Sequence, residues 1–448
     1  MLPVEMLIQV FSHLDMRSLA AASRVCHRFL SAVLRGCVWR GRTLSWDDEG
    51  LAAGRSVNTL LTILRLAPCL DAVNLRHVPA ALGGQGSPLL CGRLRDIRSL
   101  RVSDHELCTD NIARVLRRFG GTLQHLDLKL KMYYMTERMV LELWESVNQM
   151  RRLRSLRLAG YLPCRLTYTF PERALPDQTL IALDLHDFET DHAVTMLSLI
   201  MAHSSTIAKL TMPDSLSEDE VRRALDTLRV AEDVDMTVGG HIAHLNGLPI
   251  KRLTLRHKDE ACSARFLEHV NECSALAGVQ ELTVCWSDGD LRDAVLSSLA
   301  RHCGDLRVLR LRNMCDDKAP ALIHTVREFS QIRELDLNKF YPMDVQFVDE
   351  IAVGALPALT RMYLRDILIG VPHADASACD ASPCYEHHFD RLSAHRRDLS
   401  YVFHDFPQCW HRRSTISQTL SCYCAVCLDF YGYMMAHYNG GQLPGVWT

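Results

Sequence analysis

The sequence predicts an α/β fold in three successive parts: a short helical module, a long solenoid of strand–helix repeats, and a segment rich in cysteine and histidine. Apolar residues near the amino terminus recur at helical spacing. One apolar pattern then recurs about every 27 residues through the middle of the chain. Six of the 17 cysteines lie beyond residue 372, where that pattern stops.

Composition limits the classes of function. The chain has 448 residues, 48% of them hydrophobic, which is enough for a large core. The formal net charge of -3 gives no reason to expect a nucleic acid or an anionic membrane as partner. No stretch is apolar enough for a signal peptide or a membrane span. An odd number of cysteines without an export signal predicts a reducing location, the cytoplasm and/or the nucleus.

The first residues read as a compact helical module. Pro3 suits the first turn of a helix, and Asp15 stands where a second helix needs an N-cap. Trp39 can close a core that is otherwise too small. The first helix has an apolar face at i, i+3, i+4 and i+7, formed by Val4, Leu7, Ile8 and Phe11.

The order and spacing of these residues resemble the F-box motif, with Phe29 where many members have tryptophan. The resemblance implies a module that binds a Skp-family adaptor. The adaptor-binding residues that it implies are Leu2, Pro3, Val4, Leu7, Ile8, Phe11, Leu14, Leu19, Val25, Phe29 and Trp39. The alternative is a helical cap that only seals the next domain.

The middle of the chain repeats the pattern apolar-x-x-apolar-x-apolar, followed each time by a helical pattern. The middle apolar positions of its twelve copies are Val73, Leu100, Leu126, Leu156, Leu183, Leu210, Val234, Leu253, Leu282, Leu309, Leu335 and Met362. A strand–helix unit of this size cannot bury its apolar face alone, so stacked units share one core. The alternative, a doubly wound open sheet, needs a longer unit of about 30 or more residues.

This array resembles the leucine-rich repeat proteins, and the segment His302 to Leu306 is similar to the end of a repeat helix in their cysteine-containing subclass. The resemblance implies a horseshoe with parallel strands on its concave side. We therefore expect a helical module at 1–45, a linker or cap helix at 46–68, twelve repeats at 69–371 and a tail or cap at 372–448. One step, from Val234 to Leu253, is only 19 residues long.

Charged residues flank the middle apolar position of many copies, and strand geometry places them on the open face of the sheet. Near the carboxyl end this face would carry Arg310, Arg312, Arg361, Tyr363 and Arg365. Guanidinium groups bind acidic or phosphorylated segments well, so these five are candidate substrate-binding residues. The alternative is that Glu334 and Asp336 neutralise the arginines.

The tail contains Cys422, Cys424 and Cys427, and Cys424-x-x-Cys427 has the spacing of half a zinc site. No second Cys-x-x-Cys pair follows it. We therefore expect no cofactor, with reduced cysteines in a capping segment, and keep a structural zinc at these residues as the alternative.

No glycine-rich phosphate loop, nucleophile elbow or His-Glu-x-x-His motif occurs, so we do not expect an enzyme. The two resemblances together imply a substrate receptor of a Skp, cullin and F-box ubiquitin ligase. Its partners would be the adaptor, through it a cullin and a RING protein, and a protein substrate. The alternative is a scaffold that binds the adaptor without ubiquitin transfer.

Overall fold

The computed structural model describes residues 2–46, 56–76, 87–104, 109–131, 136–162, 167–171, 180–186, 188–190, 193–286, 291–313, 325–339, 343–365, 368–370, 386–403 and 408–409. The chain divides into two compact units, Met1–Val279 and Gln280–Thr448. Within the described residues, no helix combines the length and apolar character needed to cross a membrane.

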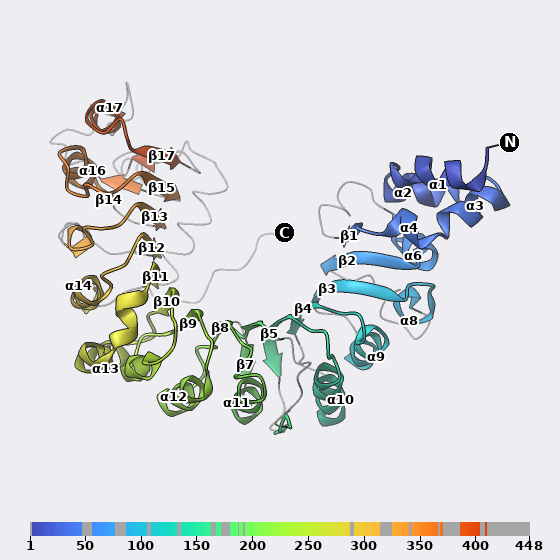
Figure 1. Ribbon diagram of the computed structural model, residues 1–448, viewed down its shortest axis with the longest axis horizontal. Helices are drawn as coiled ribbons and strands as arrows, with labels where there is room; N and C mark the ends of the chain where they lie inside the picture. The colour runs from blue at the N-terminus through green and yellow to red at the C-terminus, as the bar shows by residue number, and fades with distance from the viewer. Residues whose placement is uncertain are drawn as a thin grey trace, which may run out of the picture. The chain divides into compact units, whose positions relative to one another are not determined.

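The first unit begins with four short helices, α1 (Val4–Ser12), α2 (Met16–Ala22), α3 (His27–Val33) and α4 (Gly36–Trp39) (Figure 1). The Asp15 carboxylate accepts a hydrogen bond of 2.7 Å from the Ser18 amide and so caps α2. Trp39 is completely buried, and its indole N–H donates to the Val33 carbonyl at 2.6 Å. One large side chain with a satisfied polar atom thus closes the core of the four helices.

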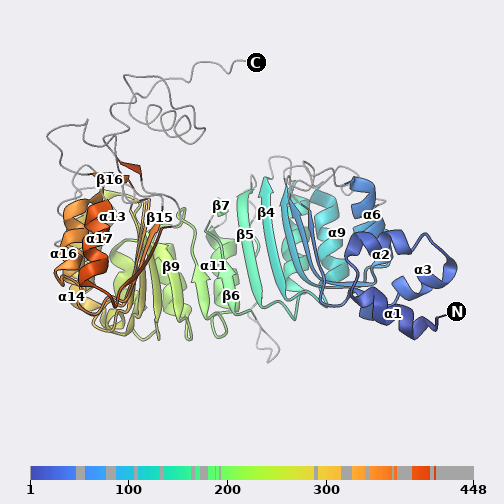
Figure 2. The same ribbon diagram turned by 90° about the horizontal axis from the view of Figure 1, so that it is seen from above.

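A parallel sheet follows in the same unit, in the order β1-β2-β3-β4-β5-β6-β8-β9-β10. Its strands are β1 (Thr43–Trp46), β2 (Cys69–Arg76), β3 (Asp96–Asp104), β4 (His125–Lys131), β5 (Ser155–Leu162), β6 (Ala182–Asp184), β8 (Lys209–Thr211), β9 (Asp233–Thr237) and β10 (Arg252–Arg256). The short strand β7 (Phe188–Thr190) pairs with the end of β5. Figure 2 shows β4, β5 and β6 side by side.

Helices of the first unit cover one face of this sheet and leave the other face open (Figure 1). They are α6 (Val57–Leu66), α8 (Pro88–Cys91), α9 (Thr109–Phe119), α10 (Glu137–Asn148), α11 (Ala193–Ala202), α12 (Glu218–Thr227) and α13 (Glu260–His269), with the 3-10 helices η1 (Gly240–Leu245), η2 (Val270–Glu272) and η3 (Ser274–Gly278). Ser217 caps α12, and its backbone N–H donates to Glu220 at 2.8 Å, as the capping-box pattern predicts.

The second unit repeats the arrangement with β11 (Glu281–Cys285), β12 (Val308–Arg312), β13 (Glu334–Asn338), β15 (Arg361–Arg365) and β17 (Ser400–Phe403), all parallel. Its helices are α14 (Arg292–His302), α16 (Val345–Ala352) and α17 (Glu386–His395). A small second sheet joins β14 (Met343–Asp344), β16 (Leu368–Gly370) and β18 (Gln408–Cys409).

All twelve copies of the apolar pattern form strands, and within each unit their middle residues lie opposite one another. Val73 pairs with Leu100 and Leu156 with Leu183 in the first unit, and Leu309 pairs with Leu335 in the second. Each of these side chains is fully buried. The expected α/β repeat solenoid, with a helical module at its amino terminus, is therefore confirmed.

Besides the short strands β7, β14, β16 and β18, the described strands β1 and β17 lie outside the twelve expected copies, and both lack the first apolar residue of the pattern. In β1, Leu44 pairs with Val73, but Gly41 stands three residues earlier, with a positive φ of 77°. In β17, Tyr401 pairs with Met362, but Asp398 stands three residues earlier. The strand β17 and helix α17 fall within 372–448, so part of the predicted tail continues the strand–helix pattern.

The 19-residue step also has a structural explanation. The connection from β9 to β10 contains η1, a short 3-10 helix, where most other connections of the first unit contain an α-helix. A tighter helix of six residues fits a unit that is too short for about three α-helical turns.

Candidate functional site

Helix α1 buries one apolar face and exposes another. Leu7 and Phe11 are 4% and 3% exposed and pack inside the helical module. Phe11 meets Phe29 edge to face, with ring centroids 5.2 Å apart. On the other side Met6 and Val10 are 46% and 52% exposed, and Leu2, just before the helix, is 57% exposed. We call these three residues the α1 stripe.

The predicted adaptor-binding residues divide according to their exposure. The buried ones are Leu7, Phe11, Leu19 and Trp39. The half-buried ones are Val4, Ile8, Leu14 and Phe29, and the exposed ones are Leu2, Pro3 and Val25. The four buried side chains shape the module from within, so a direct contact with a partner stays a prediction for the others.

Sequence reasoning missed two members of the α1 stripe, Met6 and Val10. It followed the face with mixed spacings of three and four, which holds Leu7 and Phe11. The signal for the second face was the four-residue spacing of Met6 and Val10, which places both on one side of the helix. An exposed row of large apolar side chains next to a buried one is typical of a helix that docks on a partner.

Arg42 joins this module to the sheet. Its guanidinium group donates to the carbonyls of Leu14 and Ser12 at 2.5 and 2.8 Å, and its Nε donates to the Val38 carbonyl at 2.6 Å. Its own carbonyl accepts from the amide of Asp71 at the start of β2, at 2.9 Å. Arg42 therefore binds the carboxyl ends of α1 and α4 through its side chain. Its backbone also connects the module to β2.

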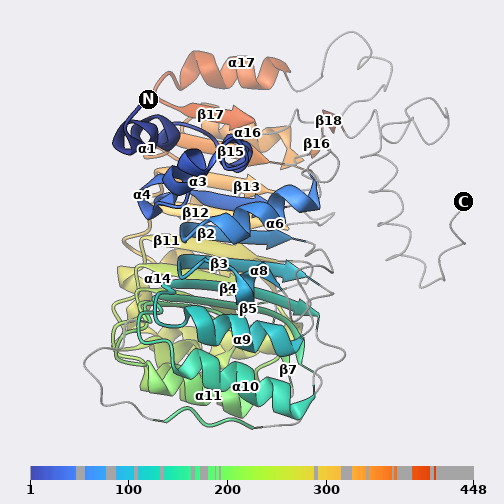
Figure 3. The same cartoon turned by 90° about the vertical axis from the view of Figure 1, so that its right-hand side faces the viewer.

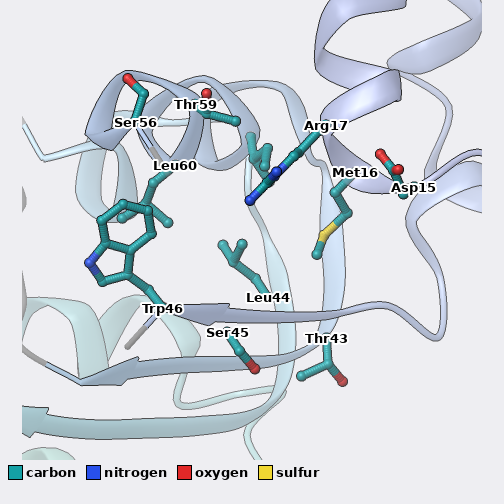
Figure 4. Close-up of a pocket in the computed structure, with 11 residues that line it drawn as sticks. Asp15, Met16, Arg17, Thr43, Leu44, Ser45, Trp46, Ser56, Thr59 and Leu60 are labelled. Carbon is teal, nitrogen blue, oxygen red and sulfur yellow. The ribbon is translucent and has the colours of Figure 1, made fainter. Parts of the chain in front are cut away.

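A cavity of about 530 Å³ lies beside this junction, between α2, β1 and α6. Figure 4 shows Leu44 of β1 and Leu60 of α6 on opposite sides of the space, with Met16 and Arg17 reaching toward it from α2. Trp46 lines the same cavity and is 4% exposed, and its indole N–H has no hydrogen-bond partner among the described residues. The lining combines the apolar side chains Leu44 and Leu60 with the polar side chains Ser45, Ser56 and Thr59.

The five candidate residues near the carboxyl end lie on two strands of the second unit, β12 and β15, with β13 between them. Arg310 lies opposite Asp336, and Asp336 lies opposite Tyr363. Arg312 and Arg365 both lie opposite Asn338. Arg361 lies opposite Glu334 on the row nearest the amino ends of the strands. The predicted grouping on the open face is therefore present in the geometry.

Most of these arginines already have carboxylate partners. Arg310 lies 2.9 Å from Glu281 and 3.7 Å from Glu334. Arg361 also lies 3.7 Å from Glu334, and Arg365 lies 3.3 Å from Asp336. The guanidinium group of Arg365 is 5.8 Å from the centroid of the Tyr363 ring. The alternative in which Glu334 and Asp336 neutralise the arginines therefore agrees with these distances.

Arg312 differs from the other four. It is exposed, and it has no ion-pair partner among the described residues of the second unit. Among the described residues, it is the arginine of this set without an ion pair, so it is the best placed to receive a carboxylate or phosphate from a partner.

The open face of the first unit is paired in the same way. Arg101 lies 2.8 Å from Asp127, and Arg157 lies 3.3 Å from Asp184 on the next two strands. Asp233 is shared by Lys209 at 3.2 Å and Arg252 at 3.1 Å. Charges of opposite sign thus alternate across the sheet and compensate one another.

One of these pairs is buried. Arg256 is 7% exposed, binds Asp235, and lies 2.9 Å from Asp214. Burial raises the pKa of the Asp235 carboxyl to about 6, although the Arg256 guanidinium opposes the shift. The cluster ties three segments together, which is a structural role.

The cysteines proposed as zinc ligands, Cys422, Cys424 and Cys427, lie outside the described residues. In the described part of the chain, no group of three His, Cys, Asp or Glu side chains is arranged to hold a metal ion. The described cysteines from Cys26 to Cys303 form no disulfide, and burial raises the pKa of Cys273 and Cys262.

A helical module followed by stacked parallel strand–helix units is the arrangement expected of an F-box and leucine-rich repeat protein. Comparison with known proteins supports this class: the F-box-like family matches residues 1–45. The F-box/LRR-repeat protein 8 of Mus musculus is 27% identical over 168 residues. The similar stretch covers 34% of this chain and 43% of that protein, so this chain spans less than half of the relative.

Proposed function

We propose that this chain is the substrate-recognition subunit of a Skp-cullin-F-box type ubiquitin ligase. The observation that carries the proposal is the α1 stripe, an exposed apolar row on an F-box-like domain. Apolar surface of this kind gains about 25 cal/mol for each Å² that a partner covers. The name of the mouse relative and the repeats behind the module support a receptor of this general class.

In this proposal the two parts of the chain have different partners. The α1 stripe, with Val25 and the half-buried Ile8, binds a Skp-family adaptor, and through it a cullin and a RING protein. The repeats bind a protein substrate, with Arg312 as the first candidate contact of the second unit. The chain itself supplies no chemistry, because holding the substrate near a ubiquitin-conjugating enzyme acts through effective concentration.

Two further expectations belong to the same proposal. The ligase would act in the cytoplasm and/or the nucleus, where free thiols such as Cys262 and Cys273 stay reduced. It would need no cofactor, and metal analysis of protein purified without chelator tests the alternative zinc at Cys422, Cys424 and Cys427.

Capture of the adaptor and the cullin from cells separates this proposal from the scaffold alternative. Wild-type protein should recover both, and Met6→Glu with Val10→Glu should recover neither, because two charges would be buried at the contact. Recovery of the adaptor without a cullin would favour the scaffold. Proteins that accumulate on the double variant when the proteasome is blocked would be candidate substrates.

A further inference from the structure

The first unit carries six arginines on the edge of its sheet where the strands begin. They fall in two short runs, Arg93-Leu94-Arg95-Asp96-Ile97-Arg98 before and within β3, and Arg151-Arg152-Leu153-Arg154 before β5. All six are exposed, and the runs contain a single carboxylate, Asp96. We call Arg93, Arg95, Arg98, Arg151, Arg152 and Arg154 the basic rim.

Backbone hydrogen bonds show that the two runs are neighbours. The amide of Gln124 donates to the carbonyl of Arg98 at 2.7 Å, and the amide of Arg154 donates to the carbonyl of Gln124 at 2.7 Å. Adjacent strands lie about 4.8 Å apart, so Arg98 and Arg154 are separated by about two strand spacings. The six arginines therefore form one patch and not two.

The patch adjoins the F-box-like module. The Cys69 thiol, at the start of β2, lies 3.3 Å from the Gly36 carbonyl of α4. The start of β3 pairs with the start of β2 through Cys69 and Asp96. Figure 3 shows the amino ends of β2 and β3 on the side of the unit where α4 lies.

Most of the positive charge of the rim is uncompensated. Arg98 lies 3.5 Å from Asp71. Arg93, Arg95, Arg152 and Arg154 have no ion pair and no side-chain hydrogen bond among the described residues. The open face of the same unit is the opposite case, because Arg101, Arg157 and Arg252 each have a carboxylate within 3.3 Å.

The common structural use of arginine at helix ends does not explain these residues. Arg118 illustrates that use, since its guanidinium donates to the carbonyls of Leu94 and Gly92 just after α8, at 2.9 and 2.6 Å. Arg93, Arg95, Arg152 and Arg154 make no such bonds to the described chain. Their donors are directed to solvent and are available to a partner.

We propose that the basic rim is a docking surface for an acidic segment of a partner protein. Each planar guanidinium presents paired donors that match a carboxylate. The two runs contain no aromatic residue on which a base could stack, so a polypeptide fits them better than a single-stranded nucleic acid. The inference rests on the charges of the rim, and it does not depend on adaptor binding.

The test is the binding of a fluorescein-labelled poly-glutamate peptide to the full chain, followed by fluorescence anisotropy. Arg95→Gln, Arg152→Gln and Arg154→Gln together should weaken binding by about tenfold or more, because three charge-assisted contacts are lost. The matched control combines Arg101→Gln, Arg157→Gln and Arg252→Gln. It removes the same charge from paired positions and should keep binding close to the wild-type value.

Melting temperatures separate docking from a stabilising role, and the rim variant should melt as the wild type does because these side chains make no ion pair or side-chain hydrogen bond with the described residues. Equal losses of binding in the two triple variants would overturn the proposal, since net charge alone would then explain binding. Tighter binding of a single-stranded RNA of equal charge would also overturn it, in favour of a nucleic-acid partner. Adaptor capture on the rim variant, expected to be unchanged, reports on the α1 stripe separately.

Discussion

The outer side of helix α1 and the open face of the sheet are both exposed, but they expose different kinds of groups. On and just before α1, the large apolar side chains of Leu2, Met6 and Val10 are exposed to water. On the open face, charged groups meet groups of opposite sign, as Arg101 meets Asp127 at 2.8 Å. Covering the first surface with a partner lowers the free energy, whereas the ion pairs of the second surface must break before it can bind.

The difference suggests where binding surfaces lie in this chain. In the sequence, a row of charged residues on the repeat face is a candidate binding surface. In the structure, ion pairs between these residues use the groups that a partner would need. Uncompensated groups are a better guide. Among the described residues they include the α1 stripe, Arg312, and Arg93, Arg95, Arg152 and Arg154 of the basic rim.

The largest expected effect comes from the buried side of α1. Phe11→Ala should lower the free energy of unfolding of the helical module by about 3–5 kcal/mol, because the ring is 3% exposed and leaves a cavity against Phe29. Val10→Ala, on the exposed side, should cost less than about 0.5 kcal/mol. Hydrogen exchange of the α1 amides measures both, and similar costs would remove the distinction between the two sides.

The buried pair of the open face should make stability depend on pH. The pKa of Asp235 is raised to about 6 by burial. A raised carboxyl pKa means that the folded chain binds the proton more tightly, so this contribution is full below about pH 4 and is lost as the pH rises through about 6. It amounts to at most about 3 kcal/mol. Chemical denaturation should show a steeper fall between these pH values for the wild type than for Asp235→Asn, and equal slopes would contradict the assignment.

Arg42 should be important because it binds the ends of both α1 and α4. Arg42→Ala should lower the free energy of unfolding by about 1.5–3 kcal/mol, since several carbonyls lose a charged donor. Arg42→Lys should recover only part of this loss, because an ammonium group cannot reproduce the planar fork. Thermal unfolding of the three proteins measures the series. Full recovery by lysine would mean that charge alone, and not the fork, holds the module to the sheet.

The smallest effect is expected for an exposed pair of the open face. Arg101 and Asp127 have side chains that are 41% and 26% exposed. Their coupling free energy should be about 0.2–1 kcal/mol, as for other surface pairs. A double-mutant cycle with Arg101→Ala and Asp127→Ala gives this quantity. A coupling well above this range would mean that the alternating charges act as a rigid network.

The repeat core could be predicted from the sequence because its pattern is periodic and its leucines occupy equivalent positions. The strands β1 and β17 could not, since Gly41 and Asp398 replace the first apolar residue of the pattern. Pairing of the arginines with Glu334 and Asp336 could be offered from the sequence only as an alternative, because the distances of Glu334 to Arg310 and Arg361 depend on the strand register. Exposure of Met6 and Val10 required knowing which side of α1 packs inward.

The central claim is that the exposed side of α1 binds a Skp-family adaptor. Titration calorimetry of the purified chain with such an adaptor tests it most directly, using Met6→Glu with Val10→Glu. Val230→Glu, which changes a 39% exposed valine elsewhere in the first unit, is the control. We expect the double variant to lose detectable binding at an unchanged free energy of unfolding, while the control binds as the wild type does. Adaptor binding by the folded double variant with wild-type affinity would contradict the claim.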